Sequence, residues 1–286
     1  MEHQFALLNG DKIEIIKKLH FKEYSELLGA MNTLSKILSQ SQLFVMIMMN
    51  HHEYNKFLEE CLKDFVKNGS KSASKMDRIV IETNRLALNL LTSIRSFLHH
   101  TETRLNREFG NDSKQLKQFK ASCSREYENH FSYRFLNGLR NYAQHCGLPI
   151  GSVGLTYELV DENTNSVTYS IRAHISRDQL LESFDWKKLR KEIQDQPNEI
   201  DVTTHINSTV YSLKRIMIDL LAEDNDIARR SALKIKKLME IKPEIAGTPC
   251  IVTTKDSQMS VQGVPAYLLD AVLDGFNSST DRKQHD

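Results

Sequence analysis

Long stretches of this chain contain neither glycine nor proline, and within them apolar residues recur every three or four positions. Only 11 glycines and 5 prolines occur in 286 residues, so few positions interrupt a helix. The sequence therefore predicts a mainly α-helical fold. A chain of this length can bury a large core as one domain or two without a metal or disulfide.

The apolar spacing predicts where the helices lie. Two or three helices are expected between Lys22 and Val66, ending at the turn-forming residues 68–72. Ser176 and Gln179 form a capping-box pattern, which predicts that a helix begins there and continues to Ile193. The other helices are expected at residues 74–109, 114–127, 131–146, 202–222, 226–241 and 266–276.

Strands are expected in two places. Residues 153–160 and 166–175 alternate apolar and polar side chains around a polar turn, which predicts a β-hairpin. A shorter strand pair is expected at residues 250–254 and 259–261. The expected organisation is a helical domain over residues 1–150, the hairpin over residues 151–175, and a helical C-terminal region over residues 176–286. That region carries the short strand pair and ends in a disordered polar tail, and a boundary within residues 176–200 also fits.

The charge balance limits how the chain can bind nucleic acid. With 38 basic against 37 acidic side chains the net charge is +1, so any RNA contact must be local. The densest basic stretch lies within residues 229–242 and, at helical spacing, either contacts phosphates or forms a solvated face. Its candidate RNA-binding residues are Arg229, Arg230, Lys234 and Lys237, accompanied by Lys236 and Lys242.

Other classes of protein are not indicated. The four cysteines form no CxxC pair, which argues against a zinc knuckle or a disulfide framework and fits a cytoplasmic protein. The most apolar run, residues 43–49, is too short to span a bilayer, and no signal peptide is recognisable. Phosphate-loop and HExxH patterns do not occur, and the histidines at 51–52 and 99–100 lack chelating spacing. We therefore expect no cofactor, metal or membrane contact.

One short pattern remains, an arginine followed five positions later by a histidine. Three pairs fit it: Arg95 with His100, Arg125 with His130, and Arg140 with His145. The spacing alone does not choose among them.

The surrounding residues single out the third pair. The run from Phe131 to Gly147, FSYRFLNGLRNYAQHCG, resembles the signature helix of HEPN-domain proteins, in which Arg and a polar residue precede His. The helix around Arg95 resembles the companion helix of that all-helical bundle, so the resemblance covers residues 74–150. It implies a metal-independent ribonuclease that works as a homodimer, commonly a toxin or a phage-defence effector with an antitoxin or defence-complex partner. A tyrosine that many HEPN toxins carry two residues after the histidine is replaced by Gly147, which argues against that form of control.

The chemistry of such a site can be stated from the residue types. RNA is cleaved by its own 2′-hydroxyl when a base removes that proton, an acid protonates the leaving oxygen and a cation stabilises the phosphorane. His145 would serve as the acid or base, Arg140 would stabilise the phosphate, and Asn141 would orient them. Ser96, His99 and Arg134 are candidate supporting residues.

Helix geometry predicts a homodimer. At 100° per residue Arg140 lies about 140° around the axis from His145, so one straight helix does not present them side by side. Two copies about a two-fold axis would bring the arginine of one to the histidine of the other.

Two functions remain open. In the first, the chain is a HEPN-type endoribonuclease. In the second, it is a catalytically silent helical module that assembles a defence or regulatory complex, with Arg140, Asn141 and His145 on an ordinary solvated flank. The near-neutral charge favours the second reading, and the intact residue set favours the first.

Overall fold

The computed structural model describes residues 1–69, 72–161, 166–222, 225–241, 247–256, 258–266 and 269–273. This part of the chain is mainly helical, as expected. The expected hairpin turn, the polar tail and Lys242 lie outside the described residues. The chain divides into two compact units, one formed by residues 1–41 with 221–286 and one by residues 42–220. This division differs from the expected boundaries, because the two ends of the chain build one unit together.

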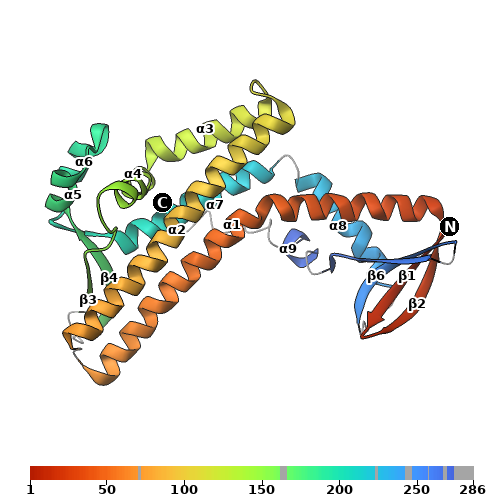
Figure 1. Ribbon diagram of the computed structural model, residues 1–286, viewed down its shortest axis with the longest axis horizontal. Coiled ribbons are helices and arrows are strands. Elements are labelled where there is room, and N and C mark those ends of the chain that lie inside the picture. Colours follow the sequence, from red (N-terminus) through yellow and green to blue (C-terminus); the bar gives the residue numbers. More distant parts are fainter. Residues whose placement is uncertain are drawn as a thin grey trace. The chain divides into compact units, whose positions relative to one another are not determined.

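The unit formed by residues 42–220 contains most of the helices (Figure 1). The predicted boundaries are confirmed to within a few residues for α2, α3, α4 and α7 and for the β3–β4 hairpin. A short strand that was not predicted, β5, extends this hairpin to a three-stranded antiparallel sheet in the order β3-β4-β5. The elements are α2 (Ala73–Phe109), α3 (Lys114–Asn129), α4 (Phe131–His145), β3 (Ser152–Asp161), β4 (Ser166–Ser176), α5 (Arg177–Ser183), the 3-10 turn η1 (Lys187–Leu189), α6 (Arg190–Gln194), β5 (Glu199–Asp201) and α7 (Val202–Leu221).

The apolar stripes predicted from the sequence face the core of this unit. The α2 stripe, Ile79, Leu86, Leu90, Ile94 and Phe97, is buried throughout. The stripe expected on α4 consists of Phe131, Phe135, Leu139, Tyr142 and Cys146. Its three central residues are buried, Phe131 is half-buried, and Cys146 is exposed because the helix ends at His145.

The helix expected from Ser176 to Ile193 is interrupted. Ser176 caps α5 by accepting a hydrogen bond from the Gln179 amide at 3.3 Å, as the capping box predicted. Phe184 is then extended, and the chain turns so that the indole of Trp186 is buried and donates to the Leu180 carbonyl at 2.6 Å. Burial of this large ring outweighs the local helical pattern.

The other unit is built on an antiparallel sheet in the order β2-β1-β6-β7. One face of the sheet, through Phe5 and Ile251, joins a core with Leu27 and Met31 of α1 and Ile235 of α8. The expected pair at 250–254 and 259–261 is confirmed as β6 and β7. The elements are β1 (Glu2–Asn9), β2 (Lys12–Leu19), the first part of α1 (Phe21–Asn68), α8 (Asn225–Met239), β6 (Thr248–Lys255), β7 (Gln258–Gly263) and α9 (Leu269–Leu273).

Two expectations for the N-terminal region were wrong. Residues 22–66 form one continuous helix, because Gly29 alone does not break it and no proline occurs there. Residues 1–19, expected to belong to a helical domain, form β1 and β2. Phe5, Ala6 and Leu7 are all buried because β1 is a central strand, so the alternation typical of a half-buried strand is missing.

The helices in the described part of the chain include none with the length and apolar character that a membrane span requires.

Candidate functional site

A groove of about 920 Å³ lies in the unit formed by residues 42–220, lined by α2, α3, α4 and the segment around η1. Helices α2, α3 and α4 meet there at an angle to one another (Figure 1). Trp186, from the segment between α5 and α6, packs against Phe135 and Tyr142 of α4. The polar side chains that line it are Arg95, His99, Glu102, Lys120, Ser124, Glu128, Arg134, Asn137, Arg140, Asn141, Asp185, Lys187 and Lys188.

The groove contains four of the six residues proposed from the sequence for the reaction centre. Arg140, Asn141, His99 and Arg134 line it, and the Arg140 guanidinium donates to Oδ1 of Asn141 at 3.2 Å. Ser96 is half-buried on α2 and does not line the groove.

His145 also lies outside this groove. It is the last residue of α4 and is exposed, whereas the groove follows the middle of that helix. The separation expected from helix geometry is therefore present, because His145 does not line the groove that contains Arg140 of the same chain.

Arg95, on α2, is a functional candidate that the sequence analysis did not name as a site residue, although it placed Arg95 in the companion helix and in one of the arginine–histidine pairs that were not selected. It lines the groove together with Arg140. Burial lowers the pKa of Arg140, and the positive charge of Arg95 lowers it further, although a guanidinium remains charged at neutral pH. Neither arginine has a carboxylate partner among the described residues. Two like charges held together in this way favour an anion between them.

The wider lining is also basic, with six Lys or Arg side chains against three Asp or Glu. Lys120 pairs with Glu102 at 3.0 Å, and Asp185 accepts the backbone N–H of Lys187 at 3.0 Å. Lys187 adopts a φ of 48°, a conformation that non-glycine residues rarely take. This local excess of positive charge contrasts with the net charge of +1 for the whole chain.

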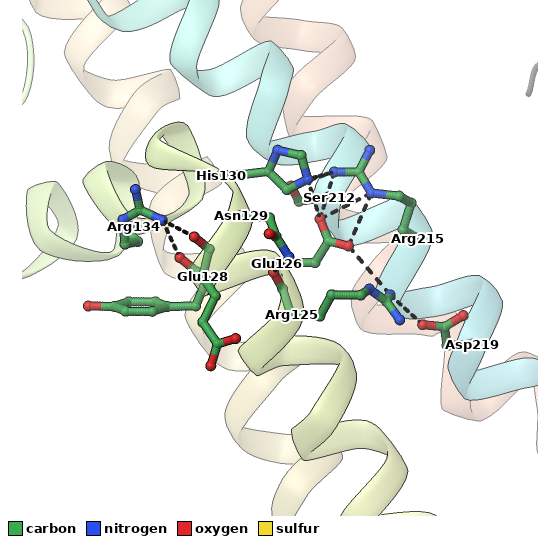
Figure 2. A network of polar contacts seen from close by, with 10 residues as sticks. Arg125, Glu126, Glu128, Asn129, His130, Arg134, Ser212, Arg215 and Asp219 are labelled. Atoms are coloured by element: carbon green, nitrogen blue, oxygen red, sulfur yellow. Dashed lines mark hydrogen bonds and ion pairs between the residues drawn. The ribbon is translucent and has the colours of Figure 1, made fainter. Parts of the chain in front are cut away.

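Arg134 has a structural role rather than a free guanidinium. It donates to the carbonyls of Tyr127 and Glu128 in the last turn of α3 (Figure 2). It also forms an ion pair with Glu192 of α6. Arginine commonly satisfies helix C-terminal carbonyls in this way, so Arg134 fixes the end of α3 against α4.

The Arg125–His130 pair takes part in a different network, between α3 and α7 (Figure 2). Glu126, 1% exposed, accepts three hydrogen bonds from the Arg215 guanidinium, at 2.6, 3.0 and 3.1 Å. His130 contacts the same guanidinium at 2.9 Å, and Arg125 pairs with Asp219 at 2.6 Å. These charges satisfy one another, so this pair holds two helices together.

The basic residues of α8 belong to the other unit. Arg229, Arg230 and Lys237 are exposed, and Lys234 lies 3.6 Å from Glu26 of α1. Their arrangement is that of a charged helix face on the unit that does not contain the groove.

No cluster of three or more potential metal ligands from His, Cys, Asp and Glu occurs within the described ranges.

Comparisons with protein-family models, with curated proteins and with solved structures gave no match to this chain.

Proposed function

We propose that the groove binds the phosphates of RNA and that the protein is a metal-independent endoribonuclease of HEPN type, with an antiparallel helical bundle built on α2 and α4. The observation that carries this proposal is the juxtaposition of Arg95 and Arg140, which lack acidic partners among the described residues, in a cavity with Asn137, Asn141 and His99. Planar guanidinium groups bind phosphate oxygens through paired hydrogen bonds.

In the proposed reaction Arg140 stabilises the negative charge that builds on the phosphorane when the 2′-hydroxyl attacks. Its contact with Asn141 holds the guanidinium in place. The attack forms the bond from the 2′-oxygen to phosphorus and breaks the bond from phosphorus to the 5′-oxygen. A histidine transfers one of the two protons, either removing the one on the 2′-hydroxyl or donating one to the leaving 5′-oxygen, and solvent water exchanges the other.

The position of His145 makes the proposal specific. Because His145 lies outside the groove of its own chain, it must reach the groove of a second copy in a homodimer. His99, one turn after Arg95 on α2, is the histidine that lines the groove and is the alternative acid–base group.

The experiment is RNA cleavage in EDTA by the full chain and by three variants, Arg140→Ala, His145→Ala and His99→Ala. The proposal predicts loss of cleavage in the first two, and mixing them should restore about a quarter of the activity through heterodimers with one intact site. Arg85→Ala is a matched control, because Arg85 is an α2 arginine paired with Glu82 outside the groove. Cleavage that needs His99 but not His145 would contradict the trans site.

The second candidate function is a silent interaction module in a defence or regulatory complex, possessing this fold without catalysis. The separation of Arg140 from His145 within one chain favours it. Wild-type protein that leaves RNA intact, and that causes no growth arrest on expression, would support this reading over the enzyme.

A further inference from the structure

Strand β7 is an open edge of the sheet in the unit built from the two ends of the chain. It pairs with β6 on one side, and the described residues provide no strand on the other. All six of its residues are exposed, including Met259 at 61% and Val261 at 43%. Backbone groups along such an edge are available to a further strand.

The opposite edge of the same sheet is protected against pairing with another chain, whereas β7 is not. Strand β2 carries four charged residues, two of which form ion pairs, Lys17 with Glu23 and Lys18 with Glu2. Charged side chains on an edge strand oppose pairing with another chain. Strand β7 has the sequence QMSVQG, which contains neither a charged residue nor a proline.

The residues of β7 are also complementary to those of a second β7 strand that runs in the opposite direction. If two copies run antiparallel with Ser260 opposite Ser260, Met259 lies opposite Val261 and Gln258 opposite Gln262. Each apolar side chain then meets an apolar one, and each amide meets an amide. Apolar cross-strand pairs of this kind stabilise a sheet.

The pairing of β7 with β6 places Met259 and Val261 beside side chains on one face of the sheet. Met259 lies opposite Thr254 and Val261 opposite Val252 in the β6–β7 register. Val252 belongs to a small apolar cluster with Ala6 and Cys250. Pairing at β7 would therefore extend an apolar sheet face across the two chains.

We propose that β7 is a homodimerisation edge, at which two copies of this chain join their four-stranded sheets into one antiparallel sheet about a two-fold axis at Ser260. This surface is separate from the groove, and the inference does not depend on the proposed function. An isologous contact of this kind closes on itself and does not propagate into a filament.

The test is sedimentation velocity of the full chain over about 1 to 100 µM. Wild-type protein should show reversible monomer–dimer exchange. Met259→Lys and Val261→Asp, each placing a charge opposite an apolar side chain, should each weaken association at least about tenfold. The double variant, and an equimolar mixture of the two single variants, should associate again because the introduced lysine of one copy then lies opposite the introduced aspartate of the other.

Ile15→Lys is the matched control, because Ile15 is a 47% exposed side chain on the other edge strand and should not affect association. Far-UV circular dichroism of each variant verifies that the sheet is intact. A monomeric wild type, single variants that associate like wild type, or failure of the paired charges to restore association would each overturn the proposal. Association of this chain with a different strand-forming protein, but not with a second copy of itself, would also overturn the proposal.

Discussion

Glu126 shows how one buried charge is tolerated inside the helical unit. Burial by itself would raise the pKa of this carboxyl, but the hydrogen bonds from Arg215 and Ser212 and the positive charge of Arg215 outweigh it, so the pKa is lowered overall. Glu126→Gln keeps the shape and removes the charge, leaving Arg215 without its partner. We expect a loss of about 2 kcal/mol in the free energy of unfolding at pH 7, measured by urea denaturation.

The pH dependence of this loss has a defined sign. A carboxyl whose folded pKa is depressed stabilises the protein above its unfolded pKa of about 4.3, and this stabilisation disappears as the pH falls through the folded value. The difference between wild type and Glu126→Gln should therefore shrink between about pH 5 and pH 3. A difference that stays constant over this range would show that Glu126 does not act through its charge.

Gly138 lies under the indole of Trp186 in the wall of the groove. A Cβ at this position would lie 2.6 Å from the ring, so Gly138→Ala must displace it. We expect a destabilisation of about 2 kcal/mol and a shift in the emission of Trp186, the single tryptophan of the chain. Gly29→Ala, also helical but with open space around its Cβ, should instead stabilise by about 0.5 kcal/mol. Similar effects of the two substitutions would contradict this packing argument.

At the scale of residues, the sequence predicted part of the candidate site. Arg140 and Asn141 were found by their resemblance to a signature helix, and their angular separation from His145 followed from the helical repeat. The role of Arg95 depends on which helix lies beside α4, and the commitment of Arg134 to the Tyr127 and Glu128 carbonyls depends on where α3 ends. The spacing of residues along the sequence predicts neither of these facts.

At the scale of elements, Asn84 joins α2 to the segment that leaves α4. Its side chain, 3% exposed, donates to the Ile150 carbonyl at 2.9 Å and accepts from the Ile150 amide at 3.0 Å. Asn84→Ala leaves both backbone groups buried and unsatisfied, so we expect a loss of about 3 kcal/mol in unfolding free energy and faster hydrogen exchange at Ile150. Asn89→Ala, at an exposed α2 position, should change stability by less than about 0.5 kcal/mol. Equal effects at both positions would refute the link.

The elements differ in how far the sequence could predict them. Helices α2, α3 and α4 are amphipathic and end at turn residues or glycine. The helical repeat of their apolar residues and the residues at their ends were therefore enough to predict them. Strand β1 is central and loses its alternation. The local signal for its hairpin is the two-residue turn Gly10-Asp11 between the paired Asn9 and Lys12, where Gly10 has a φ of 59°. The break after α5 arises from the burial of Trp186, which is a tertiary effect.

At the scale of the whole molecule, the chain ends meet in one unit. Strand β1 pairs with β6, as in the register that places Phe5 opposite Ile251. A boundary drawn along the sequence cannot represent a unit made of two distant segments, which explains why the expected divisions at residues 150 and 175 differ from the observed ones. Net charge is similarly uninformative about the groove, because acidic residues elsewhere offset its six cations.

Arg95 and Arg140 are proposed to form a phosphate-binding site, and the most direct test is the salt dependence of RNA binding. Fluorescence anisotropy with a labelled single-stranded RNA in EDTA would compare wild type, Arg95→Ala/Arg140→Ala and the control Arg85→Ala. We predict at least about tenfold weaker binding for the double variant, with the slope of log K against log salt reduced by about 1.4, and no change for the control. A double variant that binds RNA with wild-type affinity and slope would contradict the account.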